Sequence, residues 1–244
     1  MIRRISIFFG AIIVLLVIAG AAAYIYLVIT GGSPEASEEI TENVEQLDSA
    51  TDSQTVFRII QEESRVRFTL EEDLAGVRTT VIGETNQVAG DILIDRATPS
   101  NSQIGAIRIN LRTLETDRSS RDRMMRSQIL QSAKDEFEFT EFEPTHMTGL
   151  PESVSVGEAF SFQVTGNLPL AGVTKEVTFE VTVTPVSEER IEGSGTTTVL
   201  RSDYGLQIPN VQQVANVTDE VRLEIAFVAV VVQDAEINTD ASAG

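Results

Sequence analysis

The sequence contains no cysteine and no tryptophan, and it has a single histidine, His146. The absence of cysteine excludes disulfides, a thiolate nucleophile, cysteine metal sites and a lipid-modified N-terminal cysteine. One histidine cannot supply the histidine pair of a zinc site, and any nucleophile triad would depend on that residue alone.

Other chemical motifs are missing as well. There is no Gly-rich phosphate loop followed by Lys-Ser/Thr and no EF-hand spacing of acidic residues. Carboxylates are abundant, but their spacing does not select a general acid and a general base. We therefore predict no catalytic residue, no metal ligand and no cofactor, and we expect that the protein is not an enzyme.

Basic residues are scarce, because 18 Lys and Arg stand against 37 Asp and Glu, which gives a net charge of −19 at pH 7. Nucleic-acid binding is dominated by neutralisation of phosphates, so this charge argues against a nucleic-acid partner. A length of 244 residues with 42% hydrophobic content suits one packed domain with accessory segments.

One long apolar run is present. Residues 5–29 carry no charge, and at ~1.5 Å per residue they span ~37 Å, more than the ~30 Å hydrocarbon core of a bilayer. Arg3 and Arg4 precede the run, whereas residues 31–55 contain acidic residues and no Lys or Arg. The positive-inside rule then predicts a single transmembrane anchor with an extracytoplasmic C-terminal domain. The alternative is a signal peptide cleaved within residues 19–23, which would release a secreted protein.

Composition divides the rest of the chain. Residues 1–4 form a predicted cytoplasmic tip, residues 30–55 a predicted acidic flexible linker, residues 56–233 a folded domain and residues 234–244 a disordered tail. The linker is rich in Gly, Ser, Pro, Thr and Glu, so we do not expect it to contribute a core.

Alternating apolar residues predict a β-hairpin in residues 160–164 and 177–183, since a period of two is typical of strands with one buried face. Pro169 lacks a backbone donor and Gly172 permits a positive φ, so we expect the turn of the hairpin in the middle of residues 166–176. The same alternation recurs in residues 66–70, 92–94, 107–111 and 221–227.

One helix is predicted at residues 118–130, where Asp117 or Ser119 could cap the start and Met125 with Ile129 forms an apolar i, i+4 pair. There are no βαβ units. About eight antiparallel strands remove their edges most economically by closing into a barrel, and such a barrel can hold one small ligand.

Short motifs follow one another along residues 56–232. They are Ser64-x-Val66-x-Phe68, Gly90 ahead of Ile92 and Ile94, Arg121-Asp122, Gly166-x-Leu168-x-Leu170-x-Gly172-Val173-Thr174-Lys175-x-Val177, Arg201-Ser202-Asp203-Tyr204-Gly205 and Val217-x-Asp219-Glu220-Val221. In this order they resemble the YceI-like family of polyisoprenoid-binding, lipocalin-like proteins. The resemblance implies an all-β fold, an antiparallel lipocalin-like β-barrel with one short helix. The single N-terminal transmembrane helix predicted from the apolar run precedes this domain.

The chain departs from the family at polar positions. Ile60 and Glu63 stand where many relatives have Asp and His, Met124 stands where they have His, and Ala171 stands where His or Arg is frequent. Roles that depend on those polar side chains do not carry over to this chain.

The resemblance implies an isoprenoid-like or other apolar lipid held inside the barrel. The predicted lining consists of inward aromatic and aliphatic side chains and one methionine on the helix: Phe68, Ile109, Leu111, Met125, Phe160, Phe162, Phe179 and Phe227. Alternation does not distinguish a hollow interior from a filled one, so each of these residues could equally be ordinary core.

Five arginines concentrate around the predicted helix: Arg112, Arg118, Arg121, Arg123 and Arg126. Arginine forks suit phosphate or carboxylate groups, so Arg121 and Arg126 are candidates for binding a lipid head group. The alternative is that these arginines pair with the acidic stretch at residues 135–143.

The sequence thus predicts a membrane-anchored extracytoplasmic protein that sequesters or carries an apolar ligand, with residues 5–29 in the membrane. The alternative function is a protein-interaction module with a solid barrel core. An oligomer is compatible with either function.

Overall fold

The computed structural model describes residues 36–232 of the chain. The predicted cytoplasmic tip, the anchor at residues 5–29 and the tail at residues 234–244 lie outside the described residues. Between residues 36 and 232, no helix has the length and apolar character that crossing a bilayer requires.

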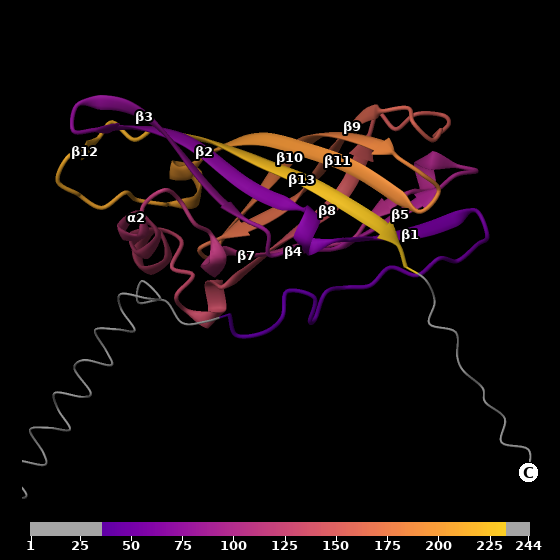
Figure 1. Ribbon diagram of the computed structural model, residues 1–244, viewed down its shortest axis with the longest axis horizontal. Coiled ribbons are helices and arrows are strands. Elements are labelled where there is room, and N and C mark those ends of the chain that lie inside the picture. Colours follow the sequence, from indigo (N-terminus) through magenta and orange to yellow (C-terminus); the bar gives the residue numbers. More distant parts are fainter. Residues whose placement is uncertain (1–35, 233–244) are drawn as a thin grey trace, which may run out of the picture.

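An antiparallel β-sheet forms the body of the protein and curls into a half-barrel (Figure 1). Its strands follow the order β4-β7-β8-β9-β10-β11-β13-β1-β5-β6, while β2 and β3 branch from β13 and β12 pairs with β2. β4 follows β3 after two residues and pairs with β7. The chain therefore returns from the β2–β3 branch to the end of the sheet formed by β4 and β7. The all-β antiparallel class is therefore confirmed.

The strands of the described chain are β1 (Gln54–Ile59), β2 (Arg65–Leu74), β3 (Val77–Thr85), β4 (Val88–Ala89), β5 (Asp91–Asp95), β6 (Gln103–Ile104), β7 (Ile107–Asn110), β8 (Phe139–Thr148), β9 (Phe160–Leu170), β10 (Val173–Pro185), β11 (Arg190–Leu200), β12 (Val214–Ala215) and β13 (Glu220–Val231). The helical elements are α2 (Ser119–Met124), the π-helical turn η4 (Met125–Ile129) and the short 3-10 helices η1 (Gln61–Glu63), η2 (Pro99–Asn101), η3 (Leu111–Thr113), η5 (Asp135–Phe137) and η6 (Arg201–Tyr204). α2 is thus the only α-helix between residues 36 and 232.

The predicted hairpin is present, and its strands are longer than expected. β9 pairs with β10 over the whole length of β9, from Leu170 with Val173 to Phe160 with Val183. Ala171 and Gly172 form the two-residue turn with φ of 48° and 85°, which the twist of a tight hairpin favours. Pro169 remains within β9, because the ladder between β8 and β9 ends at Asn167 and the missing donor breaks no pairing with β8.

The helix begins and ends close to its predicted bounds, but its start is made differently. Arg118 is the N-cap residue and makes no capping hydrogen bond through its side chain. Asp122, on the first turn of α2, accepts hydrogen bonds from the backbone NH and hydroxyl of Thr116 at 2.9 and 2.7 Å. The carboxylate of Asp122 therefore holds the loop that enters α2, in place of the predicted caps Asp117 and Ser119.

Residues 36–50, which we call the strap, run along the half-barrel from the α2 end toward β1 (Figure 1). Ile40 is only 1% exposed. The buried Arg108 of β7 binds the Glu38 carboxylate and the Glu42 backbone carbonyl, and the backbone NH of Leu47 donates to Asp91 at 3.2 Å. This part of residues 30–55 therefore differs from the flexible linker that the composition predicts, because one buried isoleucine and one buried arginine fix it to the sheet.

Candidate functional site

A cavity of about 510 Å³ lies between the concave face of the half-barrel and a second wall made by α2, η4 and the loop around β12. Its lining is mainly aliphatic and aromatic. We call the two sides the sheet wall, formed chiefly by β2, β9, β10, β11 and β13, and the helix wall, formed by α2, η4 and residues 205–219. Figure 1 shows α2 and the β12 segment gathered at one end of the half-barrel.

The cavity brings together most of the predicted lining. Seven of the eight residues border it: Phe68, Ile109, Leu111, Met125, Phe162, Phe179 and Phe227. Phe160 does not border the cavity. It lies at the start of β9, at the end of the hairpin away from its turn, and its ring stacks on Phe162 with 5.8 Å between the ring centroids.

Two phenylalanines of the sheet wall lie over glycines of the neighbouring strand. Phe68 pairs with Gly83 and Phe227 pairs with Gly193. A Cβ atom built on Gly83 would lie 2.1 Å from the Phe68 ring, and one on Gly193 would lie 2.4 Å from the Phe227 ring. The glycines therefore leave the space that these two aromatic rings occupy on the sheet.

The helix wall supplies lining that sequence reasoning missed. Met124 and Ile129 border the cavity beside Met125, and so do several apolar residues after η6, including Leu206, Ile208 and Val211. The position of Met124 was noted only as a departure from the family pattern. The residues after η6 lie mostly outside regular strands, so no periodic pattern in the sequence could identify the face they present.

The exposed lining residues indicate where the cavity opens. Arg118 and Ser120 lie at the start of α2, and Gln212 with Gln213 lies just before β12. Arg67, on β2, is the remaining exposed lining residue. We call the gap between the start of α2 and the β12 segment the mouth.

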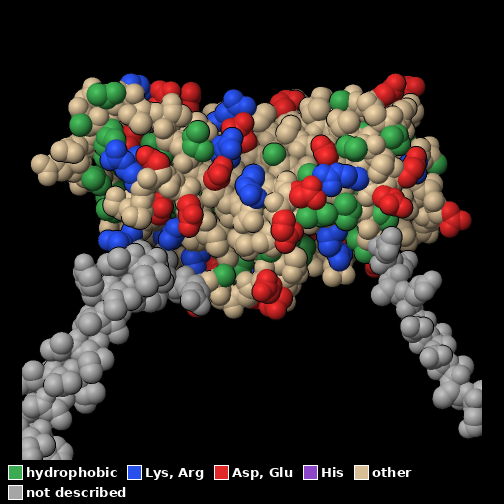
Figure 2. Space-filling model, in the orientation of Figure 1, with side chains coloured by type: hydrophobic (Ala, Val, Ile, Leu, Met, Phe, Trp, Pro, Cys, Tyr) green, Lys and Arg blue, Asp and Glu red, His purple; other side chains and the backbone are tan. Residues whose placement is uncertain are grey.

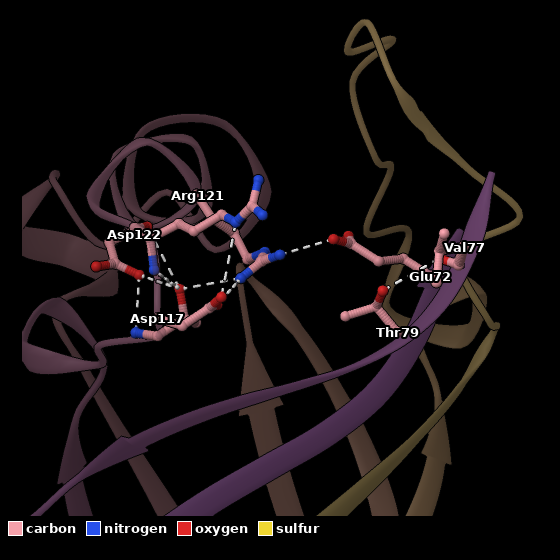
Figure 3. A network of polar contacts seen from close by, with 8 residues as sticks. Glu72, Val77, Thr79, Asp117, Arg121 and Asp122 are labelled. Carbon is pink, nitrogen blue, oxygen red and sulfur yellow. Dashed lines mark hydrogen bonds and ion pairs between the residues drawn. The ribbon is translucent and has the colours of Figure 1, made fainter. Parts of the chain in front are cut away.

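A network of polar contacts connects α2 to the sheet at the mouth (Figure 3). The Arg121 guanidinium donates to the Glu72 carboxylate of β2 at 2.6 Å and also binds Asp117. Burial lowers the pKa of Arg121, but the hydrogen bonds that it donates to Glu72 and Asp117 outweigh burial and raise the pKa above its usual value. Both Arg121 and Glu72 border the cavity.

The two predicted head-group residues are not brought together around one space. Arg121 borders the cavity with two carboxylates already bound to it, whereas Arg126 is not part of the lining and donates to the Leu114 backbone carbonyl at 3.1 Å. The alternative pairing with the acidic stretch holds for Arg112, which binds Asp135 at 2.9 Å and the fully buried Glu138 at 2.8 Å. Arg121 pairs with acidic residues outside that stretch.

Tyr204 of η6 is a further residue that the sequence did not single out for the cavity. It borders the cavity, it is only 3% exposed, and its hydroxyl has no hydrogen-bond partner among residues 36–232. Burial, with a smaller contribution from the negative charge of Asp203, raises the pKa of the Tyr204 hydroxyl to about 12. The phenol therefore stays neutral throughout the physiological range.

Comparison with known proteins agrees with this architecture. A family model described as the YceI-like domain matches residues 57–229. The chain belongs to the YceI-like family. The family membership predicted from the sequence motifs is thus confirmed.

Two solved structures share the fold of this YceI-like chain. A polyisoprenoid binding domain from Saccharophagus degradans, implicated in plant cell wall breakdown, has 16% sequence identity and a TM-score of 0.57, covering 73% of this chain and 99% of that one. BcnA from Burkholderia cenocepacia has 17% identity and a TM-score of 0.55, covering 70% and 99%. At these identities the likeness concerns the fold. None of the curated proteins compared with the chain matches it.

Proposed function

We propose that this protein is a membrane-anchored, extracytoplasmic lipid-binding protein that holds an isoprenoid-like apolar ligand in the cavity of a lipocalin-like β-barrel. In this proposal the helix wall completes the barrel that the curled sheet begins. Residues 5–29 supply the anchor, and the domain performs no covalent chemistry.

The observation that carries the proposal is the cavity itself. Its volume of about 510 Å³ falls within the ~300–1,000 Å³ typical of small-molecule sites. Its polar lining groups are few, which suits a ligand that is mostly hydrocarbon. A filled interior would have favoured the alternative of a protein-interaction module, and the apolar cavity favours the binder.

The wall contacts suit a container for a flexible chain. Met124 and Met125 border the cavity from the helical side, and unbranched thioether side chains adapt to irregular surfaces. Phe142 and Phe179 pack edge to face with 5.1 Å between ring centroids, which gives the opposite wall a fixed shape. A semi-rigid sheet facing adaptable methionines can hold an apolar chain without matching each of its atoms.

Energetics favour exchange with a membrane over capture from water. Burying a methylene from water yields ~0.8 kcal/mol, so a chain of about 20 carbons gains ~16 kcal/mol gross relative to water. Against a bilayer the gain is near zero, because lipid tails already lie in hydrocarbon. An anchored barrel beside the membrane could therefore load and unload lipid without a large uphill step.

The name of one fold relative agrees with this chemistry, since that solved neighbour is described as a polyisoprenoid binding domain. No group of three or more His, Asp or Glu suited to a metal ion occurs in the described part of the chain. Paired charges at the mouth, together with the neutral phenol of Tyr204, favour a ligand whose polar part is small.

Lipid analysis of the purified full-length protein tests the proposal. We expect organic extraction to release an apolar lipid, identified by mass spectrometry, and a fluorescent polyprenol probe to bind. Leu223 of β13 borders the cavity, and Leu223→Trp should displace about two methylenes of ligand, which at ~0.8 kcal/mol each corresponds to roughly tenfold weaker binding.

Leu200→Trp is the matched control, because Leu200 is exposed at the end of β11 and does not border the cavity. The sequence has no other tryptophan, so each variant also carries a unique fluorescence reporter. The proposal fails if the purified chain yields no lipid and binds no probe, or if the two variants lose binding equally.

A further inference from the structure

We propose that the α2 end of the domain, which carries the cavity mouth, is a docking face for an anionic lipid surface, and that the strap holds it there. The inference rests on the proposed membrane anchor. It adds an orientation of the domain on the membrane, which neither the fold nor the presence of a cavity specifies.

The strap attaches the N-terminal part of the chain at the α2 end. The backbone NH of Ser37 donates to the Glu138 carboxylate at 2.9 Å, and Glu138 also accepts from Asn110 at 3.0 Å and pairs with Arg112. Leu111, next to Arg112, borders the cavity. Figure 1 shows that the described chain begins below α2, whereas the strap reaches β1 toward the other end of the half-barrel.

This attachment shortens the connection to the membrane. Seven residues separate the predicted end of the anchor, Ile29, from Ser37, and at ~3.5 Å per residue the connection spans at most about 28 Å. The 13 residues of β10 run from the α2 end to the far end and extend over about 40 Å. The short connection therefore keeps the α2 end near the bilayer, and the far end can lie a strand length further away.

One segment at the α2 end has the charge that an anionic leaflet attracts. Residues 117–126 contain four arginines and two aspartates, a net charge of +2 in a chain whose total is −19. Figure 2 shows Lys and Arg side chains near the point where the described chain begins. Basic residues close to a membrane are attracted to anionic lipids, so the side of this end that carries the arginines should face the membrane.

An apolar side chain projects from the same end. Val77 follows the β2–β3 turn and is 65% exposed, the most exposed large hydrophobic residue of the described chain. Glu72, three residues before the Ala75–Gly76 turn, forms the ion pair with Arg121 that connects this hairpin to α2. The exposed valine and the arginines thus belong to one connected surface around the mouth, which suits an interface with lipid head groups.

Distance measurements on the full-length protein in vesicles test the inference. The absence of cysteine allows a single label at Val77→Cys, at the α2 end, or at Glu189→Cys, in the exposed turn between β10 and β11. The vesicles contain phosphatidylcholine, phosphatidylglycerol and a head-group energy-transfer acceptor. We expect higher transfer from residue 77 than from residue 189, as a separation of about 40 Å between the two ends requires.

The role of the strap is tested in the same assay by Ile40→Asp, which places a charge at a buried position, with Thr41→Asp at its exposed neighbour as the matched control. Transfer from residue 77 should fall in Ile40→Asp and remain unchanged in Thr41→Asp. Circular dichroism establishes that the sheet is retained. The comparison of the two labels in the otherwise unchanged chain decides the orientation even if Ile40→Asp reduces the yield of folded protein.

Equal transfer from the two labels, or higher transfer from residue 189, overturns the inference. Failure of the chain to float with the vesicles also overturns it, because the anchor would then be absent. Neither outcome depends on whether lipid is extracted from the protein. A cavity that binds lipid without this orientation would leave the proposed function standing and refute the docking face alone.

Discussion

The sheet wall and the helix wall of the cavity are built on different principles. The sheet wall is held by continuous ladders, such as the pairing of β9 with β10 over eleven residue pairs, and its aromatic rings lie over glycines. The helix wall consists of short elements held by side-chain contacts, among them the pair of Arg121 with Glu72 and the hydrogen bond from Arg112 to the Ser132 carbonyl just after η4. The comparison indicates that backbone pairing sets the shape of the cavity, whereas side-chain contacts position the part that opens.

The largest expected effect comes from breaking the polar support of the helix wall. Arg112→Met leaves the fully buried Glu138 without its cationic partner and frees the Ser132 carbonyl, which accepts from Arg112 at 2.8 Å. Removing one member of a buried pair costs about 3–5 kcal/mol of unfolding free energy. Chemical denaturation measures the loss. Arg96→Met, which breaks the exposed pair with Glu188, should cost no more than about 1 kcal/mol, and equal losses would contradict the distinction.

A smaller loss is expected from overpacking the sheet wall. Gly193→Val would place its Cβ 2.4 Å from the Phe227 ring and 2.9 Å from the Thr182 backbone oxygen. Either the ring or the strand must move, and overpacking of this kind typically costs about 1–3 kcal/mol. Thermal unfolding together with probe binding reports both consequences. Ser194→Val, at the exposed neighbouring position of β11, should leave the unfolding temperature and probe binding unchanged. If Gly193→Val also leaves both unchanged, the Phe227 ring does not require a glycine at position 193.

A change at the mouth should alter the rate of ligand release more than the free energy of unfolding. Glu72→Gln removes the charge opposite Arg121, which keeps its contact with Asp117. Because a glutamine amide oxygen can still accept a hydrogen bond from Arg121, we expect the contact between α2 and β2 to weaken by only about 1 kcal/mol, and therefore roughly fivefold faster release of a bound probe. Stopped-flow dissociation measures this rate. The control is Glu71→Gln on the same strand as Glu72, which removes the charge of Glu71 in its exposed pair with Arg78 of β3. An unchanged release rate in Glu72→Gln would show that the ion pair with Arg121 does not limit opening of the mouth.

The smallest effect at neutral pH is expected at Tyr204. Its hydroxyl lacks a partner among the described residues, so Tyr204→Phe should change stability little below pH 9 or so. In the folded protein the pKa of the phenol is about 12, above the usual ~10, so the folded state retains a proton that the unfolded state loses. Stability should therefore fall as pH rises from about 10 to 12.

Denaturation at several pH values compares the wild type with Tyr204→Phe, and the phenylalanine variant should show a shallower decline over that window. Introducing Tyr24→Phe and Tyr26→Phe leaves Tyr204 as the only tyrosine, so that phenolate absorbance follows this group alone. A phenol that titrates near pH 10 in the folded protein would contradict the burial argument.

Much of the sheet wall could be predicted from the sequence, because alternation reports which face of a strand is buried. Phe162, Phe179 and Phe227 were identified in this way. Alternation does not report how far along a strand the cavity extends, and Phe160 continues the period of Phe162 while lying beyond the cavity. Nor does it report whether a buried face meets packed side chains or open space.

The helix wall and the strap could not be predicted in the same way. The apolar residues after η6 follow no regular period. Ile40 is one apolar residue in a polar stretch, and its burial depends on contacts such as that between Glu38 and Arg108, 70 residues apart in the chain. Contacts between residues so distant in sequence leave no local pattern, and the composition of the segment instead resembles that of a free linker.

The docked strap also determines where the chain can be shortened without damage. A fragment that starts at β1 would lack the carboxylate of Glu38 and the amide of Ser37, which bind Arg108 and Glu138 respectively. It would leave the buried side chains of Arg108 and Glu138 without these partners. Soluble fragments for biochemical work should therefore begin before Ser37, even though the family match begins only at residue 57.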